Sequence, residues 1–207
     1  MKTVLFVGDS ITYAGRNRED GSNLGQGYPS FVAGRLGLDT PGKYRFLNRG
    51  VSGDRIVDLY VRMKRDILNL MPDFISILVG INDVWHEMDF QTGVSAARFE
   101  RVYRMLLADI REELPQSKIL LMEPFVLNGT ATVSHINYFR SEVAARAEAV
   151  RKLAKEFSVP FLPLQQDMDM LAKRAPAEYW LVDGVHPTVN GHRYIADKWI
   201  DFFQREG

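Results

Sequence analysis

Short apolar runs alternate along this chain with longer segments in which apolar residues recur at helical spacing. Each run is too short and too continuously apolar for a strand with one solvated face, so we interpret them all as buried parallel strands. The runs occupy residues 3–7, 45–48, 74–79, 118–122 and 160–164. This alternation predicts an α/β fold with helices on both faces of an open five-stranded parallel sheet. Right-handed crossovers make the flavodoxin-like strand order 2-1-3-4-5 the simplest arrangement.

The helical segments have ordinary stop signals. Two of them, 55–70 and 96–114, end shortly before a proline, because the residue before a proline disfavours the helical conformation. No internal repeat or linker-like run divides the chain, which predicts a single domain over residues 1–207. The expected helices are 29–36, 55–70, 96–114, 142–157 and a last one that begins at His186-Pro187.

Charge and composition exclude several classes of function. Lys plus Arg and Asp plus Glu both number 26, so no net charge steers the chain toward nucleic acid or an anionic membrane. The absence of Cys excludes thiol catalysis, thiolate metal sites and disulfides. The sequence shows neither a signal peptide nor a run of about 18 apolar residues, so we expect a cytoplasmic protein. No glycine-rich loop has the spacing of a nucleotide site, so we expect no cofactor.

Polar, glycine-containing turns follow the first three predicted strands. They are Gly8-Asp9-Ser10, residues 48–54 and residues 79–83. Ligands bind outside the carboxyl ends of the strands in open α/β sheets, so we expect these turns at the functional edge. Taken alone, the first turn favours Ser10 as a helix cap. A nucleophilic serine would also need a general base and hydrogen-bond donors for the oxyanion.

His186 is the candidate base. Among the four His residues it alone has a carboxylate three positions upstream, Asp183, and a proline directly after it. Pro187 disfavours the helical conformation for His186, so the ring is presented from a turn at a helix start. Asp183 can fold back to fix the tautomer and to stabilise the imidazolium. The alternative is a surface turn in which His186 caps the helix, and His192 fits a packing or surface residue.

Donors for the oxyanion can come from the same turns. Gly53 has no side chain, so its N–H can approach an oxyanion closely. Asn82 can add a side-chain amide, and the N–H of Ser10 can supply a third donor. Taken singly, Gly53 fits a turn residue and Asn82 fits a helix cap. Their joint occurrence at neighbouring strand ends favours a hydrolase site. Asp9, with its short acidic side chain, can instead bond to backbone N–H groups and hold the turn.

Several residues near these turns and near the last helix could shape a substrate pocket. Aromatic planes at a concave edge suit stacking on a sugar ring, although packing at a loop base or a subunit contact is an equal alternative for each. No long apolar lid is visible, which argues against a lipase that acts on lipid droplets. The pocket candidates are Asp9, Tyr13, Trp85, His86, Tyr179 and Trp180.

The blocks that contain Ser10, Gly53, Asn82 and His186 resemble, in order, those of the SGNH, or GDSL-type, hydrolases, which take their name from these four residues. The similarity runs from residue 3 to the final helix. It implies a flavodoxin-like three-layer α/β/α sandwich, metal-independent hydrolysis of acyl esters and a homo-oligomer. The longer strings VGDSITYAGR, NRGVSGDRIVDL, PDFISILVGINDVW and DGVHPTVNGH are most similar to bacterial intracellular acetylxylan esterases and related carbohydrate deacetylases.

We therefore predict a serine esterase that removes short acyl groups, acetyl foremost, from carbohydrate through an acyl-enzyme on Ser10. His186 is the predicted base, Asp183 orients it, and Ser10, Gly53 and Asn82 form the oxyanion hole. The predicted partner is a small acylated substrate such as an acetylated xylo-oligosaccharide, without nucleic acid, membrane or metal. A lysophospholipase or thioesterase of the same family is an alternative. Others are a catalytically silent glycan-binding module and a metal-dependent hydrolase built on Asp9, Asp83, Asp183 and His186.

Overall fold

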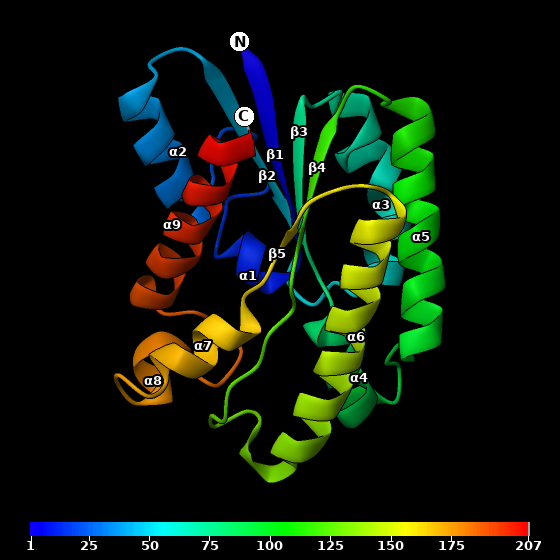
Figure 1. Ribbon diagram of the computed structural model, residues 1–207, viewed down its shortest axis with the longest axis vertical. Coiled ribbons are helices and arrows are strands. Elements are labelled where there is room, and N and C mark those ends of the chain that lie inside the picture. Colours follow the sequence, from blue (N-terminus) through cyan, green and yellow to red (C-terminus); the bar gives the residue numbers. More distant parts are fainter. Residues whose placement is uncertain (207) are drawn as a thin grey trace.

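A computed structural model describes residues 1–206 and contains a five-stranded parallel sheet (Figure 1). The strands lie in the order β2-β1-β3-β4-β5, and every neighbouring pair is parallel, which confirms the predicted topology. The strand bounds are Lys2–Gly8 (β1), Tyr44–Gly50 (β2), Phe74–Leu78 (β3), Lys118–Met122 (β4) and Phe161–Leu162 (β5).

Long helices cover both faces of the sheet (Figure 1). Helices α2 (Tyr28–Asp39) and α9 (Val189–Glu206) pack on one face, and α3 (Ile56–Asp66), α5 (Ala96–Glu113) and α6 (Ile136–Glu156) cover the other. This is the expected three-layer α/β/α sandwich. No helix within residues 1–206 is both long enough and apolar enough to cross a membrane. Smaller helices occupy the connections: α1 (Ser10–Tyr13), α4 (Ile81–Phe90), α7 (Gln165–Leu171), α8 (Ala177–Trp180) and 3-10 turns at Leu68–Leu70 and Val133–His135.

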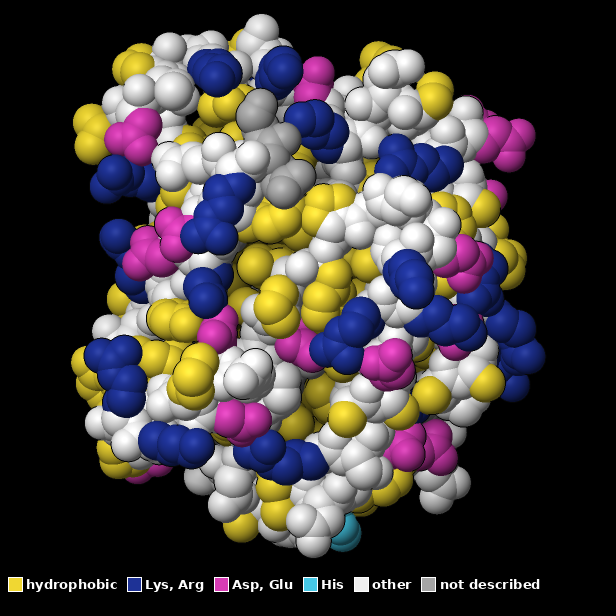
Figure 2. Space-filling model, viewed as in Figure 1, with side chains coloured by type: hydrophobic (Ala, Val, Ile, Leu, Met, Phe, Trp, Pro, Cys, Tyr) yellow, Lys and Arg dark blue, Asp and Glu magenta, His cyan; other side chains and the backbone are white. Residues whose placement is uncertain are grey.

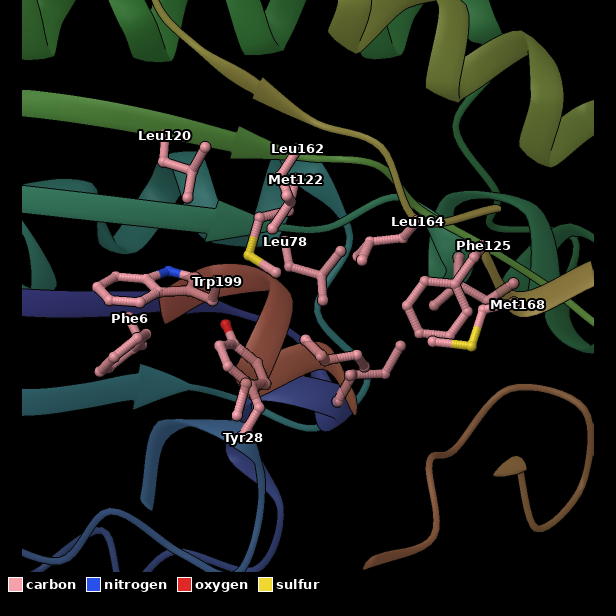
Figure 3. Packing of buried hydrophobic residues seen from close by; sticks show 14 of the residues in the cluster. Phe6, Tyr28, Leu78, Leu120, Met122, Phe125, Leu162, Leu164, Met168 and Trp199 are labelled. Atoms are coloured by element: carbon pink, nitrogen blue, oxygen red, sulfur yellow. The ribbon is translucent and has the colours of Figure 1, made fainter. Parts of the chain in front are cut away.

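The apolar runs are continuous because helices cover both faces of each strand. In β1, Val4 and Phe6 join the core cluster beneath α2 and α9, whereas Leu5 and Val7 join the cluster beneath α3, α5 and α6. Trp199 of α9 lies beside Phe6 (Figure 3). Their ring centroids are 5.3 Å apart. Each fully buried side chain of this size contributes roughly 1.5–3 kcal/mol to stability. Burial on both faces thus fixes the sheet between its two helical layers.

Two predicted elements, the fifth strand and the last helix, have other bounds in the structure, and both differences occur at prolines. The fifth strand has only two residues, because Pro160 and Pro163 flank it and a proline has no N–H for the ladder. The last helix begins at Val189 instead of His186-Pro187, since Pro187 forms an antiparallel bridge with Leu181. The segment that carries His186 is therefore an extended turn pinned to another part of the chain.

Two further helix bounds differ from the expected ones. The helix predicted at 142–157 begins at Ile136, and its first turns bury Phe139 and Val143 in the cluster beneath α2 and α9. The helix predicted at 55–70 ends at Asp66 and gives way to a 3-10 turn. In both cases tertiary packing, which the local apolar pattern does not record, decides where the helix stops or starts.

The first three strands end at one level of the sheet. Gly8 pairs with Gly50 of β2 and with Leu78 of β3, so the turns after these strands begin side by side. A side chain at Gly8 is impossible, because a Cβ atom there would lie 2.2 Å from the Leu78 carbonyl oxygen and 2.5 Å from Thr12 Oγ1. The missing side chain lets the chain turn directly into α1, and it places the next residues at the carboxyl edge of the sheet.

Candidate active site

Ser10 is the first residue of α1, directly beyond the carboxyl end of β1. The helix cap is the preceding residue, Asp9, whose Oδ1 accepts the Ile11 N–H at 2.9 Å. The Ser10 hydroxyl is thus not used for capping. Its Oγ lies instead 2.9 Å from Nε2 of His186, a residue 176 positions further along the chain.

The His186 ring is held by Asp183. Its Nδ1 lies 2.7 Å from Asp183 Oδ2, and the other carboxylate oxygen accepts the N–H groups of Val185 at 2.9 Å and His186 at 2.8 Å. An ionised carboxylate can only accept, so Nδ1 carries the proton and Nε2 keeps a lone pair for the Ser10 hydroxyl. The three side chains form a continuous hydrogen-bonded chain that ends at the serine oxygen.

The electrostatics of the pair favour an anionic Asp183 beside a readily protonated imidazole. Burial alone would raise the pKa of Asp183, but the hydrogen bonds from the His186 ring and from the two backbone N–H groups outweigh it and lower this pKa to about 2. The hydrogen bond to Asp183 raises the pKa of His186 above its ordinary value, against the opposing effect of burial. A charged imidazole is therefore stabilised at the moment it receives a proton.

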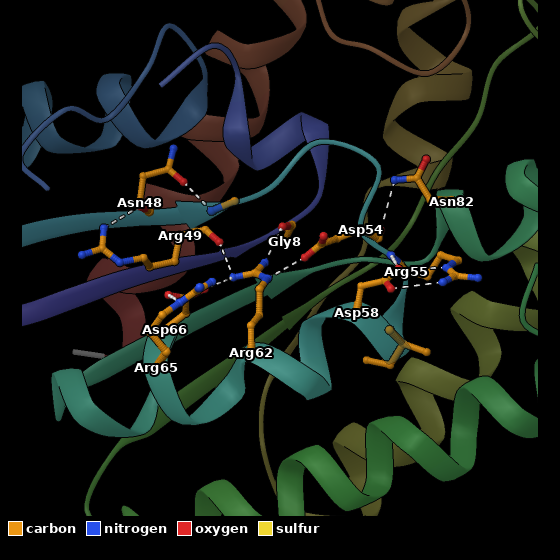
Figure 4. Close-up of polar contacts among 12 residues, drawn as sticks. Gly8, Asn48, Arg49, Asp54, Arg55, Asp58, Arg62, Arg65, Asp66 and Asn82 are labelled. Carbon is orange, nitrogen blue, oxygen red and sulfur yellow. Dashed lines mark hydrogen bonds and ion pairs between the residues drawn. The ribbon is translucent and has the colours of Figure 1, made fainter. Parts of the chain in front are cut away.

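Two candidate oxyanion donors lie in the turns after β2 and β3. Gly53 has a φ of +83°, a conformation that favours glycine, and a Cβ there would meet nothing closer than the His86 ring at 3.9 Å. Asn82 is in the first turn of α4 and is 6% exposed. One Asn82 amide hydrogen is donated to the Asp54 carbonyl oxygen, with Nδ2 3.1 Å from that oxygen (Figure 4). The second amide hydrogen makes no hydrogen bond within residues 1–206.

Asp9 and Asp83 lie beneath the site and do not line its surface. They are 1% and 0% exposed, and each accepts backbone N–H groups, Asp9 from Ile11 and Asp83 from Ile56. Burial raises the pKa of Asp9 to about 7 and the pKa of Asp83 well above its ordinary value. Asp9, predicted among the pocket residues, is therefore a buried helix cap. Within residues 1–206 no group of three or more His, Asp or Glu side chains is placed to hold a metal ion.

Two of the predicted pocket residues, Trp85 and His86, come from α4. The Trp85 ring centroid is 5.8 Å from that of His186, and the His86 ring lies 3.9 Å from the position that a Cβ atom of residue 53 would take. Burial lowers the pKa of His86, so this ring is neutral at neutral pH. Tyr13 ends α1, the helix that Ser10 begins.

Tyr179 and Trp180 form a separate pair within α8, with ring centroids 4.9 Å apart. Within the described chain, no hydrogen bond or ring contact joins this pair to Ser10 or His186. Tyr179 is half exposed, and Trp180 packs against the core cluster beneath α2 and α9. Their place in a substrate pocket stays a prediction.

His192 packs in the interior, one of the two roles expected for it. It is 8% exposed and accepts the Tyr28 N–H through Nδ1, and burial lowers its pKa to about 4, so its ring is neutral. The sequence did not reveal the contacts of Arg62. Arg62 of α3 donates to the carbonyl oxygens of Gly8 at 3.1 Å and Arg49 at 2.8 Å, and its Nε lies 2.6 Å from Asp54 Oδ2 (Figure 4). These Arg62 contacts have no local sequence signal, because they join segments distant in the chain.

A three-layer α/β/α sandwich with a serine–histidine–aspartate chain at the carboxyl edge of its sheet is the architecture of a serine hydrolase. The model of the GDSL-like lipase/acylhydrolase family matches residues 6–194, so the chain belongs to this family and is a carboxylic ester hydrolase. The sequence is 32% identical to the acetylxylan esterase of Geobacillus stearothermophilus. The alignment is 207 positions long and covers 95% of this chain and 91% of that protein. It is 25% identical to thioesterase 1/protease 1/lysophospholipase L1 of Escherichia coli K12 over 199 residues, covering 96% and 81% of the two chains.

Solved structures agree with this assignment. A Parabacteroides merdae protein assigned to the GDSL-like lipases superposes with a TM-score of 0.92 at 35% identity, covering 97% of this chain and 94% of that one. Axe2, an acetylxylan esterase from G. stearothermophilus, superposes with a TM-score of 0.86 at 31% identity, covering 97% and 93%. Three solved Axe2 variants, each called a catalytic mutant, replace a serine, an aspartate and a histidine, the last two three positions apart.

Proposed function

We propose that this protein is a serine esterase that removes short acyl groups, acetyl foremost, from carbohydrate. The observation that carries the proposal is the unbroken hydrogen-bond chain from Ser10 Oγ to His186 Nε2 at 2.9 Å and from His186 Nδ1 to Asp183 Oδ2 at 2.7 Å. A serine in this arrangement has the base that it needs to become a nucleophile. The Axe2 variants called catalytic mutants support the same three roles, because their residue types and spacing match.

The reaction proceeds through an acyl-enzyme. His186 Nε2 takes the Ser10 proton as Oγ bonds to the ester carbonyl carbon, and the carbonyl electron pair moves onto its oxygen. The tetrahedral centre collapses, the bond to the sugar oxygen breaks, and His186 gives its proton to that oxygen. A water then passes a proton to His186 and attacks the acyl carbon. Acetate leaves as the proton returns to Ser10.

The developing oxyanion is held by the N–H groups of Ser10 and Gly53 and by the amide of Asn82. The Asn82 side chain is held in place by its bond to the Asp54 carbonyl oxygen, so its free N–H is oriented before the substrate arrives. Such fixed donors cost no reorganisation during the reaction, and each accounts for about 3–4 kcal/mol of barrier lowering in comparable hydrolases.

Trp85 and His86 form the side of the site that binds the sugar. Both come from α4, which also carries Asn82, so one helix links sugar recognition to the oxyanion donor. The acetylxylan esterase relationship supports an acetylated xylo-oligosaccharide as substrate. The E. coli relative, whose name includes thioesterase and lysophospholipase, favours a second candidate: hydrolysis of longer acyl chains or of thioesters.

A hydrolysis panel decides between the two substrates. We expect p-nitrophenyl acetate and acetylated xylo-oligosaccharides to be cleaved, p-nitrophenyl butyrate less well, and p-nitrophenyl octanoate, an acyl thioester and a lysophospholipid poorly or not at all. Preference for octanoate or the lysophospholipid without any release of acetate from the oligosaccharide would reject the carbohydrate assignment.

The catalytic role of Ser10 is tested separately. An organophosphonate should label the wild type once and leave Ser10→Ala unlabelled, while chelator leaves activity unchanged. Absence of labelling in the wild type would point to a silent glycan-binding module. Activity that persists in Ser10→Ala but disappears with chelator would point to a metal-dependent hydrolase. The cytoplasmic location and the homo-oligomer remain predictions.

A further inference from the structure

A polar cavity of about 420 Å³ opens beside the carboxyl end of β2. Four guanidinium groups line it: Arg16 and Arg18 from the segment after α1, Arg49 from β2, and Arg65 from α3. We call it the arginine cavity. Its volume falls within the usual range of small-molecule sites.

The negative charge in the arginine cavity is smaller than the positive charge. Asp66 is already engaged by Arg62 and Arg65, with N–O distances of 3.0 Å and 2.8 Å. Glu19 is the other acidic residue in the lining. Within residues 1–206, no carboxylate forms an ion pair with Arg16, Arg18 or Arg49. The cavity therefore holds a local surplus of positive charge in a chain whose net charge is zero.

Arg16 is the most informative member. Its side chain is 5% exposed, yet only Nε makes a hydrogen bond, to the Gly50 carbonyl oxygen at 2.9 Å. The two terminal nitrogens make no hydrogen bond or ion pair in the described part of the chain. Burial lowers the pKa of Arg16 to about 10, and repulsion from Arg49 and Arg18 adds to the shift. The guanidinium thus has one protein acceptor and lies beside two further positive charges, while its terminal nitrogens are not enclosed and can reach a ligand in the cavity.

Arg49 and Arg18 also have few partners within residues 1–206. Arg49 Nη1 donates to the Asn48 carbonyl oxygen at 3.0 Å, which leaves its other end group free, and Arg18 makes no hydrogen bond within residues 1–206. Figure 4 shows Arg49 on β2 together with Arg65 and Asp66 of α3. Guanidinium groups suit phosphate and carboxylate, because their planar N–H pairs match two oxygens at once.

We propose that the arginine cavity binds the phosphate or carboxylate group of a small anionic ligand, with Arg16, Arg18 and Arg49 as its donors. An anion there would relieve the repulsion among these groups and use their free N–H donors. The Arg16 guanidinium carbon also lies 6.0 Å from the ring centroid of Tyr13, the last residue of the helix that Ser10 begins. The ligand would thus sit next to the candidate active site but outside it. This proposal does not depend on the identity of the ester.

Titration calorimetry at low ionic strength tests this site with three probes: inorganic phosphate, glucuronate, and glucose as the neutral control. We expect saturable binding of one or both anions, none of glucose, and weaker binding as salt is added. Arg18→Gln and Arg49→Gln should each reduce the affinity at least about tenfold, because each removes a charge-assisted hydrogen bond. Arg35→Gln, at an exposed arginine paired with Asp39, should change nothing.

Ser10→Ala should bind the anions as the wild type does, so the result is independent of the esterase proposal. Phosphate alone would identify a phosphate monoester site, glucuronate alone a uronate site, and both the shared anion site. The proposal is overturned if neither anion saturates, or if Arg49→Gln binds as tightly as Arg35→Gln. It is also overturned if sedimentation shows that Arg49→Gln separates an oligomer while neither anion binds, because a second copy would then occupy the cavity.

Discussion

At the residue scale, Asn82 combines a structural bond with the proposed catalytic one. One amide hydrogen is bonded to the Asp54 carbonyl oxygen, and the other is the proposed oxyanion donor. Asn82→Ala should lower kcat by about two to three decades with little change in KM, since the lost donor acts in the transition state. Steady-state kinetics with p-nitrophenyl acetate measure this. A near-wild-type kcat in a folded variant would remove Asn82 from the oxyanion role.

The Asp183–His186 pair sets the pH dependence of the reaction. His186 must be neutral to accept the Ser10 proton, and its pKa is raised by the hydrogen bond to Asp183. The kcat/KM profile should therefore fall as pH decreases through a midpoint above the ordinary histidine value of 6.5. In Asp183→Asn the midpoint should move to lower pH, because the anion that stabilised the imidazolium is gone, and kcat should fall by about 10⁴. An unchanged midpoint in that variant would contradict the coupling.

Asp9 gives a stability test with a defined sign. Burial raises the pKa of this carboxyl from 3.8 to about 7 in the folded chain, so the folded state keeps a proton that the unfolded state releases above about pH 4. The stabilisation that comes from the proton retained on Asp9 is therefore complete below pH 4, and it is lost as pH rises through about 7. Asn at position 9 keeps an oxygen for the Ile11 N–H but carries no charge.

Asp9→Asn should consequently be more stable than the wild type at pH 8, by up to about 4 kcal/mol, with the difference vanishing near pH 4. Urea denaturation at pH 4, 6 and 8 measures the trend. An identical difference at all three pH values would mean that Asp9 does not hold the extra proton.

At the element scale, Arg62 ties together the ends of β1, β2 and the turn that leads to Gly53 and Asp54. Its guanidinium binds the Gly8 and Arg49 carbonyl oxygens and the Asp54 carboxylate, and the Asp54 carbonyl oxygen in turn holds Asn82. The side chain is 9% exposed, so these contacts are made out of water. A single residue of α3 therefore positions the two turns that supply the proposed oxyanion donors.

Arg62→Met should lower the free energy of unfolding by about 3–5 kcal/mol, because it leaves the buried Asp54 carboxylate without its positively charged partner. It should also lower kcat more than it changes KM, since the oxyanion donors lose their alignment. Arg65→Met is the matched control: it pairs with the same Asp66 but its side chain is 67% exposed, so we expect a loss of at most about 1 kcal/mol and an unchanged kcat. Equal kcat values in the two variants at a temperature well below both unfolding transitions would exclude a positioning role for Arg62.

The sequence predicts correctly those elements whose own residues show a clear apolar pattern. β4 was predicted with its observed bounds, and the strand-end turns located the site, because continuous apolar runs report burial on both faces. α4 was not predicted as a helix, since its first turn buries the polar side chains of Asn82 and Asp83 and breaks the apolar periodicity. The Arg62 contacts and the arginine cavity could not be found either, because they depend on side chains that meet only after the strands are ordered.

At the scale of the whole molecule, the sheet joins two separate core clusters. All three Trp residues belong to the side beneath α2 and α9: Trp199 is in that cluster, and Trp85 and Trp180 pack against it. The long α5 lies on the opposite side and carries Leu107, which is fully buried. Tryptophan fluorescence therefore reports on one face of the sheet, while far-UV circular dichroism reports on the helices of both.

If the chain unfolds as the single domain predicted from its sequence, a cavity on one face must destabilise both faces together. Leu107→Ala should lower the free energy of unfolding by about 2–5 kcal/mol and shift the fluorescence and circular dichroism transitions by the same amount. Leu38→Ala, the same substitution at a 77% exposed position, should leave both transitions within about 0.5 kcal/mol of the wild type. A shift of the circular dichroism transition without a shift of the fluorescence transition would mean that α3 and α5 open on their own, because neither helix carries a Trp.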